Sequence, residues 1–590
     1  MQKTYINIGL IETAFTSDRY PLLFSGMQTD TPAFEMVGQL VHHTQDAELI
    51  KRIIISGLPA DYEQGNGNTI EQLDDKIERT LAQGWHEEKP VNGPPSTVDN
   101  LMALMEEHNC GLFHDAFKRT YISVNDNRVR RTYLLGSTAA KRYLQHLYYL
   151  EYRKPMNSQN FKLACDMLEA KALFEGETKK IYLRVAGDMG RVFINLANDK
   201  AEVVEIDKSG YRISTDSTVT FVTSPSMSAM PNPKEVDNAL GRFKELLGLD
   251  DKRYARVLGF IIGALNPLGP YLCLLVEGEQ GSGKSFLTEC IKTIIDPSLA
   301  MKMRLPDNER DLMIMARSTH GMLFDNVSSI KGDISDALCT LSTGGGRMTR
   351  KLYTDDEMAI FNEIRPFILN GIAAYATRPD LLDRSLSLSL EAMPEEKRRG
   401  EHYMREEFEV LLPGIMHELF EIISCALRNF ETTEEPKGVR MTDAARFLVA
   451  AEPATNLEAG SMLSALKESQ KEIIAESLSK NSLAMAIITF VENRKRFSGK
   501  MNDLLRKLST EGEVDRYFPK TAAHLSRDLS RLKPALNKVG IIVDFQPRTN
   551  TGRAIELYAS EDFETGEIVS DVDTTQKRGI PRPLKSGIKM

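Results

Sequence analysis

The sequence predicts a multidomain chain of the α/β and α+β classes. A central α/β domain with a phosphate-binding loop follows a small β-rich module and precedes a C-terminal winged helix. Three observations support this fold class. The 590 residues are too many for one hydrophobic core. A glycine-rich turn at residues 278–285 lies between an apolar run and a helical pattern. The last folded stretch has helical patterns and then two strand patterns joined by a turn.

Changes in the apolar period set the boundaries between the predicted parts. Helical patterns run from about 99 to 175, and period-two stretches separated by Gly, Asn and Asp turns fill about 178 to 223. Beyond residue 235, apolar strands alternate with helices. The predicted parts are a mostly helical region (1–95), a helical plus β-rich accessory module (99–225), the phosphate-loop domain (235–395), a helical lid or linker (396–480), a winged-helix-like domain (485–560) and a disordered, basic-ended tail (561–590).

The composition favours a soluble globular protein over a membrane, secreted or disulfide-rich one. The apolar fraction of 42% and the charged fraction of 27% are typical of a soluble globular protein. No apolar run approaches the roughly 20 residues of a membrane span, and the first residues lack the pattern of a secretion signal. The six cysteines are scattered without a C-x-x-C pair, and His42 and His43 have no cysteine or carboxylate at ligand spacing. We therefore expect a cytoplasmic protein without disulfides, structural zinc or a membrane partner.

The stretch LLVEGEQGSGKSFLTECI fits the phosphate-loop pattern G-x-x-x-x-G-K-S. Glycines allow the backbone N–H groups to surround phosphates, the lysine adds positive charge, and the serine hydroxyl is a ligand for Mg²⁺. ATP and Mg²⁺ are therefore the predicted cofactors, and a chance match of a glycine-rich turn is the alternative. The residues predicted to bind the nucleotide are Gly278, Gln280, Gly281, Ser282, Gly283, Lys284, Ser285 and Phe286.

A second motif, HGMLFDNVSS, supplies the acid that an ATPase needs to hold its metal. Asp325 ends an apolar run about forty residues after the loop, so we predict that it binds Mg²⁺ together with Ser285. An ordinary aspartate closing a strand is the alternative. The next residue is Asn326, where many such ATPases have a glutamate that activates water. Asparagine orients a water and cannot take its proton, so Asp333 and Asp336 are further candidates for the general base.

The third motif is RPFILNGIAAYATRPDLLDR. An apolar strand ends at Asn370, which is predicted to contact the γ-phosphate or position the attacking water; an Asn-Gly turn is the alternative. Fourteen residues on, Arg384 is the first candidate for an arginine that a neighbouring subunit supplies to the reaction, and Arg378 is the second. A surface salt bridge is the alternative for either arginine.

The segment between these motifs, TGGGRMTRKLYTDDE, predicts a glycine-flanked hairpin with a basic tip. Arg347, Arg350 and Lys351 are candidates for pairing with the phosphates of DNA, and a charged solvated loop is the alternative.

In combination, the phosphate loop, FDN, TGGG…R…LYTD, ILNGI and RPDLLDR resemble the superfamily-3-type helicases of the AAA+ class. More narrowly, they are similar to the ATP-binding, primase-helicase-related proteins of phages and mobile elements. Further stretches, GLFHDAF, AKALFEG, RDLMIMA and RMTDAARFLVAAEPA, extend the resemblance over roughly 100 to 560. The resemblance implies a ring-forming ATPase that assembles as a homo-hexamer. Its hairpins would line a channel and draw single-stranded DNA through it.

The C-terminal part fits a DNA-binding role. Two helical pieces, a strand, a turn and a second strand follow the order of a winged helix. Residues 491–553 hold 14 Lys and Arg against 7 Asp and Glu in a chain of net charge -9. A winged helix that contacts protein is the alternative. The candidate contacts to DNA are Arg527, Arg531 and Lys533 near one face, and Arg548 and Arg553 at the turn.

Together these patterns predict an ATP-dependent DNA helicase for the replication of a phage or mobile element. Residues 1–240 hold no cysteine set for zinc and no convincing acid cluster for a metal, so a separate primase or polymerase is a candidate partner. A replication initiator that ATP switches, without processive unwinding, is the alternative that Asn326 favours. An ATPase that moves protein is a third reading, against which the basic winged helix argues.

Overall fold

The computed structural model describes Val37, Leu40 and residues 46–55, 70–82, 96–126, 129–345, 347–350, 358–372, 375–376, 378–392, 399–479, 481–511, 518–549 and 552–560. The chain divides into two compact units. The first consists of Met1–Leu104 with Met156–Ala164, and the second of Met105–Pro155 with Cys165–Met590.

The first unit is built from short helices. Its described helices are α4 (Ala47–Ile55), α5 (Ile70–Ala82) and the start of α6 (Thr97–Glu107). Isoleucines of α4 and α5 form a small buried cluster, and Lys51 pairs with Asp74 across the two helices at 2.6 Å. A capping box starts α6, because the side chains of Ser96 and Asp99 each accept a hydrogen bond from the backbone N–H of the other.

The second unit begins with the accessory module. It holds a mixed sheet of order β3-β2-β1-β4, an antiparallel sheet of order β6-β7-β8-β9, and the parallel pair β10-β5. Its elements are β1 (Gly111–His114), β2 (Thr120–Asp126), β3 (Val129–Leu134), α7 (Thr138–Tyr152), α8 (Ser158–Phe174), β4 (Glu177–Thr178), β5 (Ile181–Tyr182), β6 (Val185–Gly187), β7 (Val192–Asn195), β8 (Val203–Asp207), β9 (Gly210–Ser214) and β10 (Thr220–Phe221). The start of α8, as far as Ala164, belongs to the first unit.

The expectation of helical patterns throughout 99–175 was wrong for the first three of these strands. Tyr121 to Val124 of β2 are all buried, so this strand shows no alternation of apolar and polar residues. A strand buried on both faces cannot be told from a helix by its period.

A four-stranded parallel sheet forms the centre of the next part, in the order β12-β15-β11-β16. Met303 makes a parallel bridge to Phe324 at the outer edge of β12. The elements here are α9 (Ala239–Leu247), α10 (Asp251–Ala264), β11 (Cys273–Gly278), α11 (Lys284–Ile295), α12 (Glu309–Ser318), β12 (Met322–Phe324), α13 (Gly332–Thr343), β13 (Arg347–Arg350), β14 (Met358–Phe361), β15 (Phe367–Asn370), α14 (Pro379–Leu382) and β16 (Ser385–Leu390).

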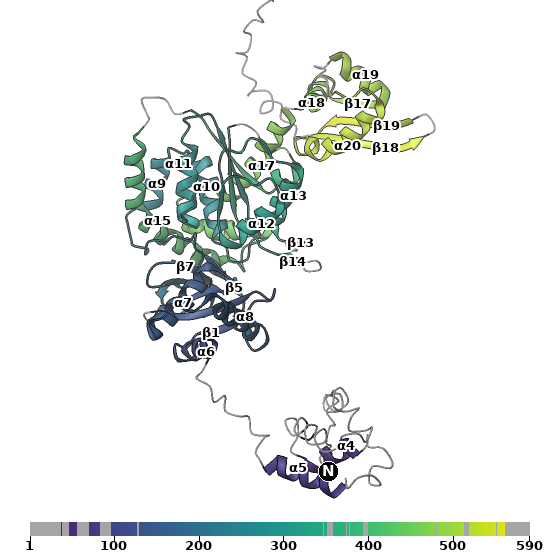
Figure 1. The fold of residues 1–590 in the computed structure, drawn as a ribbon. Helices are drawn as coiled ribbons and strands as arrows, with labels where there is room; N and C mark the ends of the chain where they lie inside the picture. The colour runs from purple at the N-terminus through teal and green to yellow at the C-terminus, as the bar shows by residue number, and fades with distance from the viewer. Residues whose placement is uncertain are drawn as a thin grey trace, which may run out of the picture. The chain divides into compact units, whose positions relative to one another are not determined.

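Both faces of this sheet are covered by helices. Leu274 and Val276 of β11 join a core shared with α10, α11 and α15, whereas Cys273 and Leu275 join a core shared with α12 and α13. Figure 1 shows these two helical layers on either side of the strands. Strands buried on both faces have continuous apolar sequences, which is why this sheet is readable from the sequence.

The helices that follow complete the first core. They are α15 (Glu401–Asn429), α16 (Thr442–Ala451), the short 3-10 helix η3 (Glu452–Ala454) and α17 (Ser461–Ser479). By length and composition α15 could cross a membrane, which the sequence analysis did not anticipate, but 72% of its apolar window is buried inside the protein. Among the described residues, α17 and α18 pass the same test only as a pair bent by 104°. The burial of α15 in the core accounts for its apolar character.

The C-terminal part is a three-stranded antiparallel sheet with helices. Its elements are α18 (Ser482–Arg494), β17 (Arg496–Lys500), α19 (Met501–Glu511), α20 (Ala522–Lys538), β18 (Ile541–Thr549) and β19 (Gly552–Ala559), and the strand order is β17-β19-β18. Two expectations needed correction. The sequence analysis missed β17, and it divided α20 into two pieces although the helix continues through Pro534.

Candidate functional site

The glycine-rich turn joins β11 to α11 and has the conformation that glycine permits. Gly278, Gly281 and Gly283 have φ of +155°, +84° and +82°, in the region that other residues avoid. A Cβ on Gly278 would lie 2.3 Å from the carbonyl oxygen of Leu390 on β16. Only glycine therefore fits at the first position of the loop while β11 and β16 stay paired.

Lys284 is the first residue of α11 and is turned back into the loop. Its ammonium donates hydrogen bonds to the carbonyls of Gly278 at 2.7 Å and Glu279 at 2.6 Å, and contacts Ser282 Oγ at 3.3 Å. Burial lowers the pKa of Lys284, and the negative charge of Asp325 opposes that shift. The lysine and the acid of the next motif therefore influence each other electrostatically.

Asp325 and Asn370 meet at the carboxyl ends of neighbouring strands. The Nδ2 atom of Asn370 donates a hydrogen bond to Asp325 Oδ1 at 2.6 Å. Asn370 is 2% exposed, and its Oδ1 atom is buried without a hydrogen-bond partner in the described structure. A buried polar atom without a partner is costly unless a ligand or water satisfies it. The amide oxygen of Asn370 is therefore available to a polar ligand.

The residue after Asp325 has an unusual backbone. Asn326 is exposed and has φ of +55°, a left-handed conformation in which asparagine is enriched. A glutamate at this position would have to adopt the same strained conformation. Of the two further candidates for the base, Asp333 is exposed in the first turn of α13, and Asp336 pairs with Arg378 at 2.9 Å.

Lys302 is a further charged residue at this edge that the sequence analysis missed. Its ammonium pairs with Glu289 at 2.6 Å, which raises the pKa of Lys302, and Asp325 contributes to the same shift. No motif surrounds this lysine in the sequence. It reaches the sheet edge through the isolated β-bridge between its neighbour Met303 and Phe324 of β12, which pairs residues far apart in the sequence.

The two candidate arginines have different environments. Arg384 lies just before β16, and its side chain is 12% exposed and pairs with Asp380 at 2.6 Å. The register of β11 with β16 pairs Cys273 with Ser385 and Gly278 with Leu390, so Arg384 lies at the amino end of the sheet, opposite the phosphate loop of its own chain. Arg378 is 44% exposed and also donates to the carbonyl of Gly332 at 2.6 Å.

The predicted basic hairpin is present as β13 and β14, with Arg347 opposite Phe361 and Arg350 opposite Met358. Lys351 and the acidic cluster 355–357 lie outside the described residues. At the foot of the hairpin, the carboxylate of Glu363 is 8% exposed and lies between two arginines. Arg119 of the accessory module is 3.1 Å away, and Arg317 is 3.3 Å away. The sequence analysis did not anticipate this link to the accessory module.

The predicted DNA contacts of the C-terminal part lie on its longest helix and its strand turn. Arg527 and Arg531 are exposed and one turn apart on α20. Lys533 departs from the expected common face, because its ammonium stands 5.7 Å from the ring centre of Phe545 on β18. Arg548 and Arg553 are opposite each other in the register of β18 and β19. The candidate contacts therefore lie on α20 and on the paired ends of β18 and β19.

The residues at the loop edge fit a nucleoside triphosphate with Mg²⁺. Three glycines hold the strained loop, Lys284 supplies a cation, and Asn370 has an unsatisfied amide oxygen. Ser285 is exposed at the start of α11, and Asp325 is partly exposed on the neighbouring edge. Among the described residues, no group of three or more His, Cys, Asp or Glu side chains could hold a metal ion alone. A site of one hydroxyl and one carboxylate is suited to Mg²⁺, which keeps several waters and takes phosphate oxygens as ligands.

Two family models match parts of the chain. The family model described as actinomycete integrative conjugative element replication protein matches residues 249–473, and the model of the C-terminal domain of the same RepA proteins matches residues 483–571. Both describe a replication protein of a mobile element. Over these two ranges the chain is similar to the replication proteins of actinomycete integrative conjugative elements. This confirms the expectation of a mobile-element replication protein, whereas the resemblance to helicases stays a prediction.

Solved structures add little. An A form apo structure of the NrS-1 C-terminal region aligns with 10% identity and a TM-score of 0.38, covering 80% of this chain and 100% of that one. A second apo structure of the same region aligns with 10% identity and a TM-score of 0.37, covering 79% and 100%. Likenesses this weak carry no argument for the fold. No curated protein matches the chain.

Proposed function

We propose that this replication protein is an ATP-dependent DNA helicase that assembles into a ring. The observation that carries the proposal is the hydrogen bond between Asn370 and Asp325 beside the loop of Lys284. Because β15 lies between β11 and β12, the three residues come from three adjacent parallel strands. This arrangement supports a P-loop ATPase of the AAA+, superfamily-3-like type, in which a sensor residue lies between the phosphate loop and the metal-binding acid.

In this proposal each side chain has a separate role. The loop glycines and Lys284 hold the phosphates, and Ser285 with Asp325 holds Mg²⁺. Bound together, ATP and Mg²⁺ would supply a terminal phosphoryl group that water can attack, with ADP as the leaving group. Asn370 positions that water or contacts the terminal phosphate, while its Nδ2 atom keeps Asp325 oriented. The hydrogen bond therefore links metal binding to the sensor residue.

The hairpin gives the ATPase a means to act on DNA. It follows α13, which begins shortly after the loop of Asp325, and it leads directly into β15, which ends at Asn370. Both ends of the segment are thus connected to strands that meet the nucleotide site. Arg347, Arg350 and Lys351 would contact the phosphates of a single strand. The exposed arginines of α20 and the order of the C-terminal elements support a winged helix that holds duplex DNA.

A second function is favoured by Asn326. Its exposed, left-handed position offers no carboxylate to take a proton from water. An initiator that binds ATP, changes its assembly on DNA and hydrolyses slowly needs no strong base there. The two functions differ in whether single-stranded DNA stimulates turnover, and in whether a fork is unwound.

The proposal is tested with the full chain and the Asn370→Ala variant. The wild type should hydrolyse ATP faster with single-stranded DNA and separate a forked duplex. Asn370→Ala should still bind ATP, and its turnover should fall on the order of 100-fold, as for loss of a preorganised polar group. The exposed Asn456→Ala is the matched control and should leave turnover unchanged. Electron microscopy with an ATP analogue and forked DNA should show a ring. ATP binding without unwinding would favour the initiator, and undiminished turnover by Asn370→Ala would overturn the site.

A further inference from the structure

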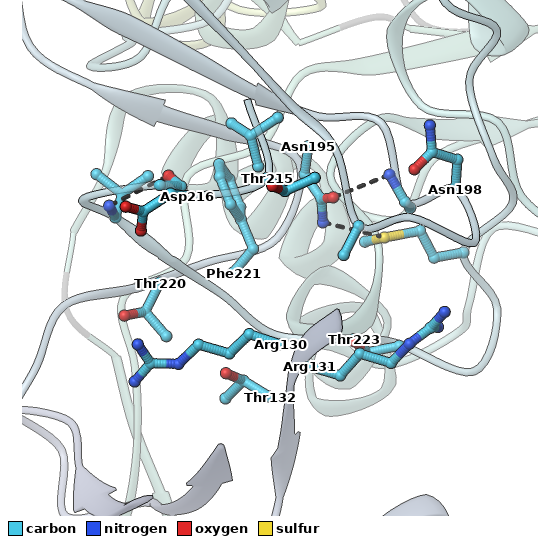
Figure 2. Close-up of a pocket in the computed structure, with 16 residues that line it drawn as sticks. Arg130, Arg131, Thr132, Asn195, Asn198, Thr215, Asp216, Thr220, Phe221 and Thr223 are labelled. Carbon is cyan, nitrogen blue, oxygen red and sulfur yellow. Dashed lines mark hydrogen bonds between the residues drawn. The ribbon is translucent and has the colours of Figure 1, made fainter. Parts of the chain in front are cut away.

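The accessory module contains a pocket of about 190 Å³ that the proposed ATPase does not use. It lies where the strand β3, the loop after β7 and the threonine-rich segment 215–223 come together. The backbone N–H of Thr223 donates to the carbonyl of Thr132 at 2.8 Å, which joins this segment to β3. In Figure 2, Arg130 and Arg131 lie on one side of the pocket, and Asn195, Thr215 and Phe221 lie across from them.

Two arginines and one carboxylate, that of Asp216, line this pocket, and the arginines are not paired with that carboxylate. Arg130 donates from Nε to the hydroxyl of Ser123 at 2.8 Å, and Arg131 donates to the carbonyl of Asp199 at 3.0 Å. Within the part of the chain that the structure describes, neither guanidinium forms an ion pair with a carboxylate. From Gly111 to Phe221 the sequence holds 18 Lys and Arg against 13 Asp and Glu, although the whole chain carries a net charge of -9. An anionic partner is therefore favoured here.

One aromatic ring lines the pocket with the arginines, and a second lies beside that ring, outside the lining. Phe221 lines the pocket and lies 6.3 Å from Tyr182, measured between ring centres. Both rings are half-buried, and the ammonium of Lys180 stands 5.1 Å from the ring centre of Tyr182. Cations that track phosphates beside aromatic faces that accept bases are the usual combination of single-strand binding proteins.

The size of the pocket argues for part of a polymer. Pockets that enclose a whole small molecule usually exceed about 300 Å³. A space of about 190 Å³ is below that range, and it suits one unit of a longer chain whose neighbours lie outside. The pocket also belongs to the module that meets the hairpin foot, where Arg119 contacts Glu363 at 3.1 Å.

We propose that this pocket is a second binding site for single-stranded nucleic acid. Arg130 and Arg131 contact the phosphates, and Phe221 with Tyr182 accepts a base. The site extends the proposed DNA function, since it would hold the strand on the accessory-module side of the hairpin. Its binding step requires no ATP, so it can be tested even if the chain is not a helicase.

The test compares full-length variants of equal charge in binding to a labelled 20-nucleotide poly(dT) without ATP. The pocket variant is Arg130→Gln with Arg131→Gln. The control is Arg142→Gln with Arg153→Gln, two exposed arginines at either end of α7 that do not line the pocket. The pocket variant should bind about tenfold more weakly. The slope of the logarithm of its binding constant against the logarithm of salt concentration should become shallower by about 1.4. This is roughly 0.7 for each phosphate that an arginine no longer neutralises. The control should keep most of the affinity and slope.

Three further results decide the matter. Phe221→Leu, which keeps an apolar side chain, should weaken binding several-fold because stacking is removed. An oligonucleotide containing 5-iododeoxyuridine should crosslink to the peptides of Tyr182 or Phe221 in the wild type. Inorganic phosphate or thymidine monophosphate at millimolar concentration should fail to displace the oligonucleotide, whereas displacement would assign the pocket to a free anion. Equal affinities for pocket and control variants, with no crosslink, would overturn the site. Unchanged basal ATP turnover separates this outcome from a failure of the ATPase.

Discussion

Arg184 and Asp296 form a fully buried ion pair, with Nε and Oδ1 separated by 2.9 Å, although the two residues are 112 positions apart in the sequence. Arg184 belongs to the accessory module, and Asp296 follows α11, the helix that begins at Lys284. The other carboxylate oxygen of Asp296 accepts from the backbone of His320 at 2.9 Å and contacts Lys292 at 3.1 Å. The neighbouring cations lower the pKa of Asp296, against the effect of burial. The ion pair thus connects the accessory module to the C-terminal end of α11.

Removing Arg184 should loosen this attachment. Arg184→Ala leaves the carboxylate of Asp296 buried with Lys292 as its remaining cationic partner. Breaking such a buried pair costs roughly 3–5 kcal/mol of stability. Hydrogen exchange followed by mass spectrometry should show faster exchange in the peptides of β7 and α11. Arg212→Ala is the control in the same module, because Arg212 is 58% exposed in its pair with Glu205. Its removal should cost less than about 1 kcal/mol. Equal effects of the two variants would contradict the assignment.

The buried His320 should make stability depend on acid. Its Nε2 atom lies 2.9 Å from the carbonyl of Ala264. Burial lowers the pKa of His320 to about 4; Arg365 and Arg184 act in the same direction, and Asp296 opposes them. The unfolded chain, with a histidine pKa near 6.5, therefore binds a proton more readily than the folded chain. Up to about 3 kcal/mol of stability is present above pH 6.5 and is lost as the pH falls through about 4.

Denaturation by urea at several pH values checks this prediction. The His320→Gln variant lacks the titrating group and keeps a polar side chain. Its stability should decline less steeply than that of the wild type between pH 6.5 and 4, while the carboxylates common to both chains titrate equally. Parallel pH profiles would show that the histidine is not responsible.

Lys284→Ala should abolish ATP turnover without unfolding the chain. The lysine's hydrogen bonds in the structure are to two carbonyls and a hydroxyl of its own loop, which water can replace at this edge. Turnover and circular dichroism measure the two effects. Lys471→Ala, an exposed lysine of α17, is the control. Persistent hydrolysis by Lys284→Ala would remove the loop from the proposed site.

Replacing the two candidate arginines should have different effects on stability. Arg384→Ala removes a largely buried guanidinium whose partner Asp380 is 47% exposed, so we expect thermal stability to fall. Arg378→Ala removes a more exposed side chain and should change stability little. If Arg378 acts on the neighbouring subunit, a mixture of Arg378→Ala and Lys284→Ala chains should recover turnover, since mixed interfaces restore some complete sites. A mixture that stays inactive while rings form would point instead to action within one chain.

Replacing Arg350 and Lys351 with alanine should uncouple DNA from the ATPase. Basal hydrolysis should persist because neither residue belongs to the nucleotide site. Stimulation by single-stranded DNA and unwinding of a fork should disappear together, and the salt dependence of binding should flatten because fewer counterions are released. Residual duplex binding is expected from the arginines of α20. Normal unwinding by the double variant would make the hairpin a solvated loop and would favour the initiator.

Local patterns allowed prediction of the strands that form the proposed nucleotide site, but not of the contacts that connect the parts. The strands ending at Gly278, Phe324 and Asn370 are apolar runs followed by polar residues, and both properties are visible in the sequence. Their order in the sheet is not visible, because pairing joins residues far apart. The link of Arg119 to Glu363 was likewise unpredictable, since 244 residues separate the two. Lys533 was placed on the wrong face although it lies two residues from Arg531, and residues two apart on one helix do not face the same way.

The loop carbonyls that hold Lys284 have a consequence for selectivity among the anions of the cell. The ammonium already has two short hydrogen bonds, to the carbonyls of Gly278 and Glu279. The binding free energy of an anion is therefore only the difference between its own contacts with the ammonium and the hydrogen bonds that it replaces. A lone phosphate or sulfate offers little beyond this exchange. A chain of phosphates can satisfy Lys284 and the loop N–H groups at the same time. If the loop holds a nucleotide as proposed, we therefore expect it to bind small oxyanions weakly.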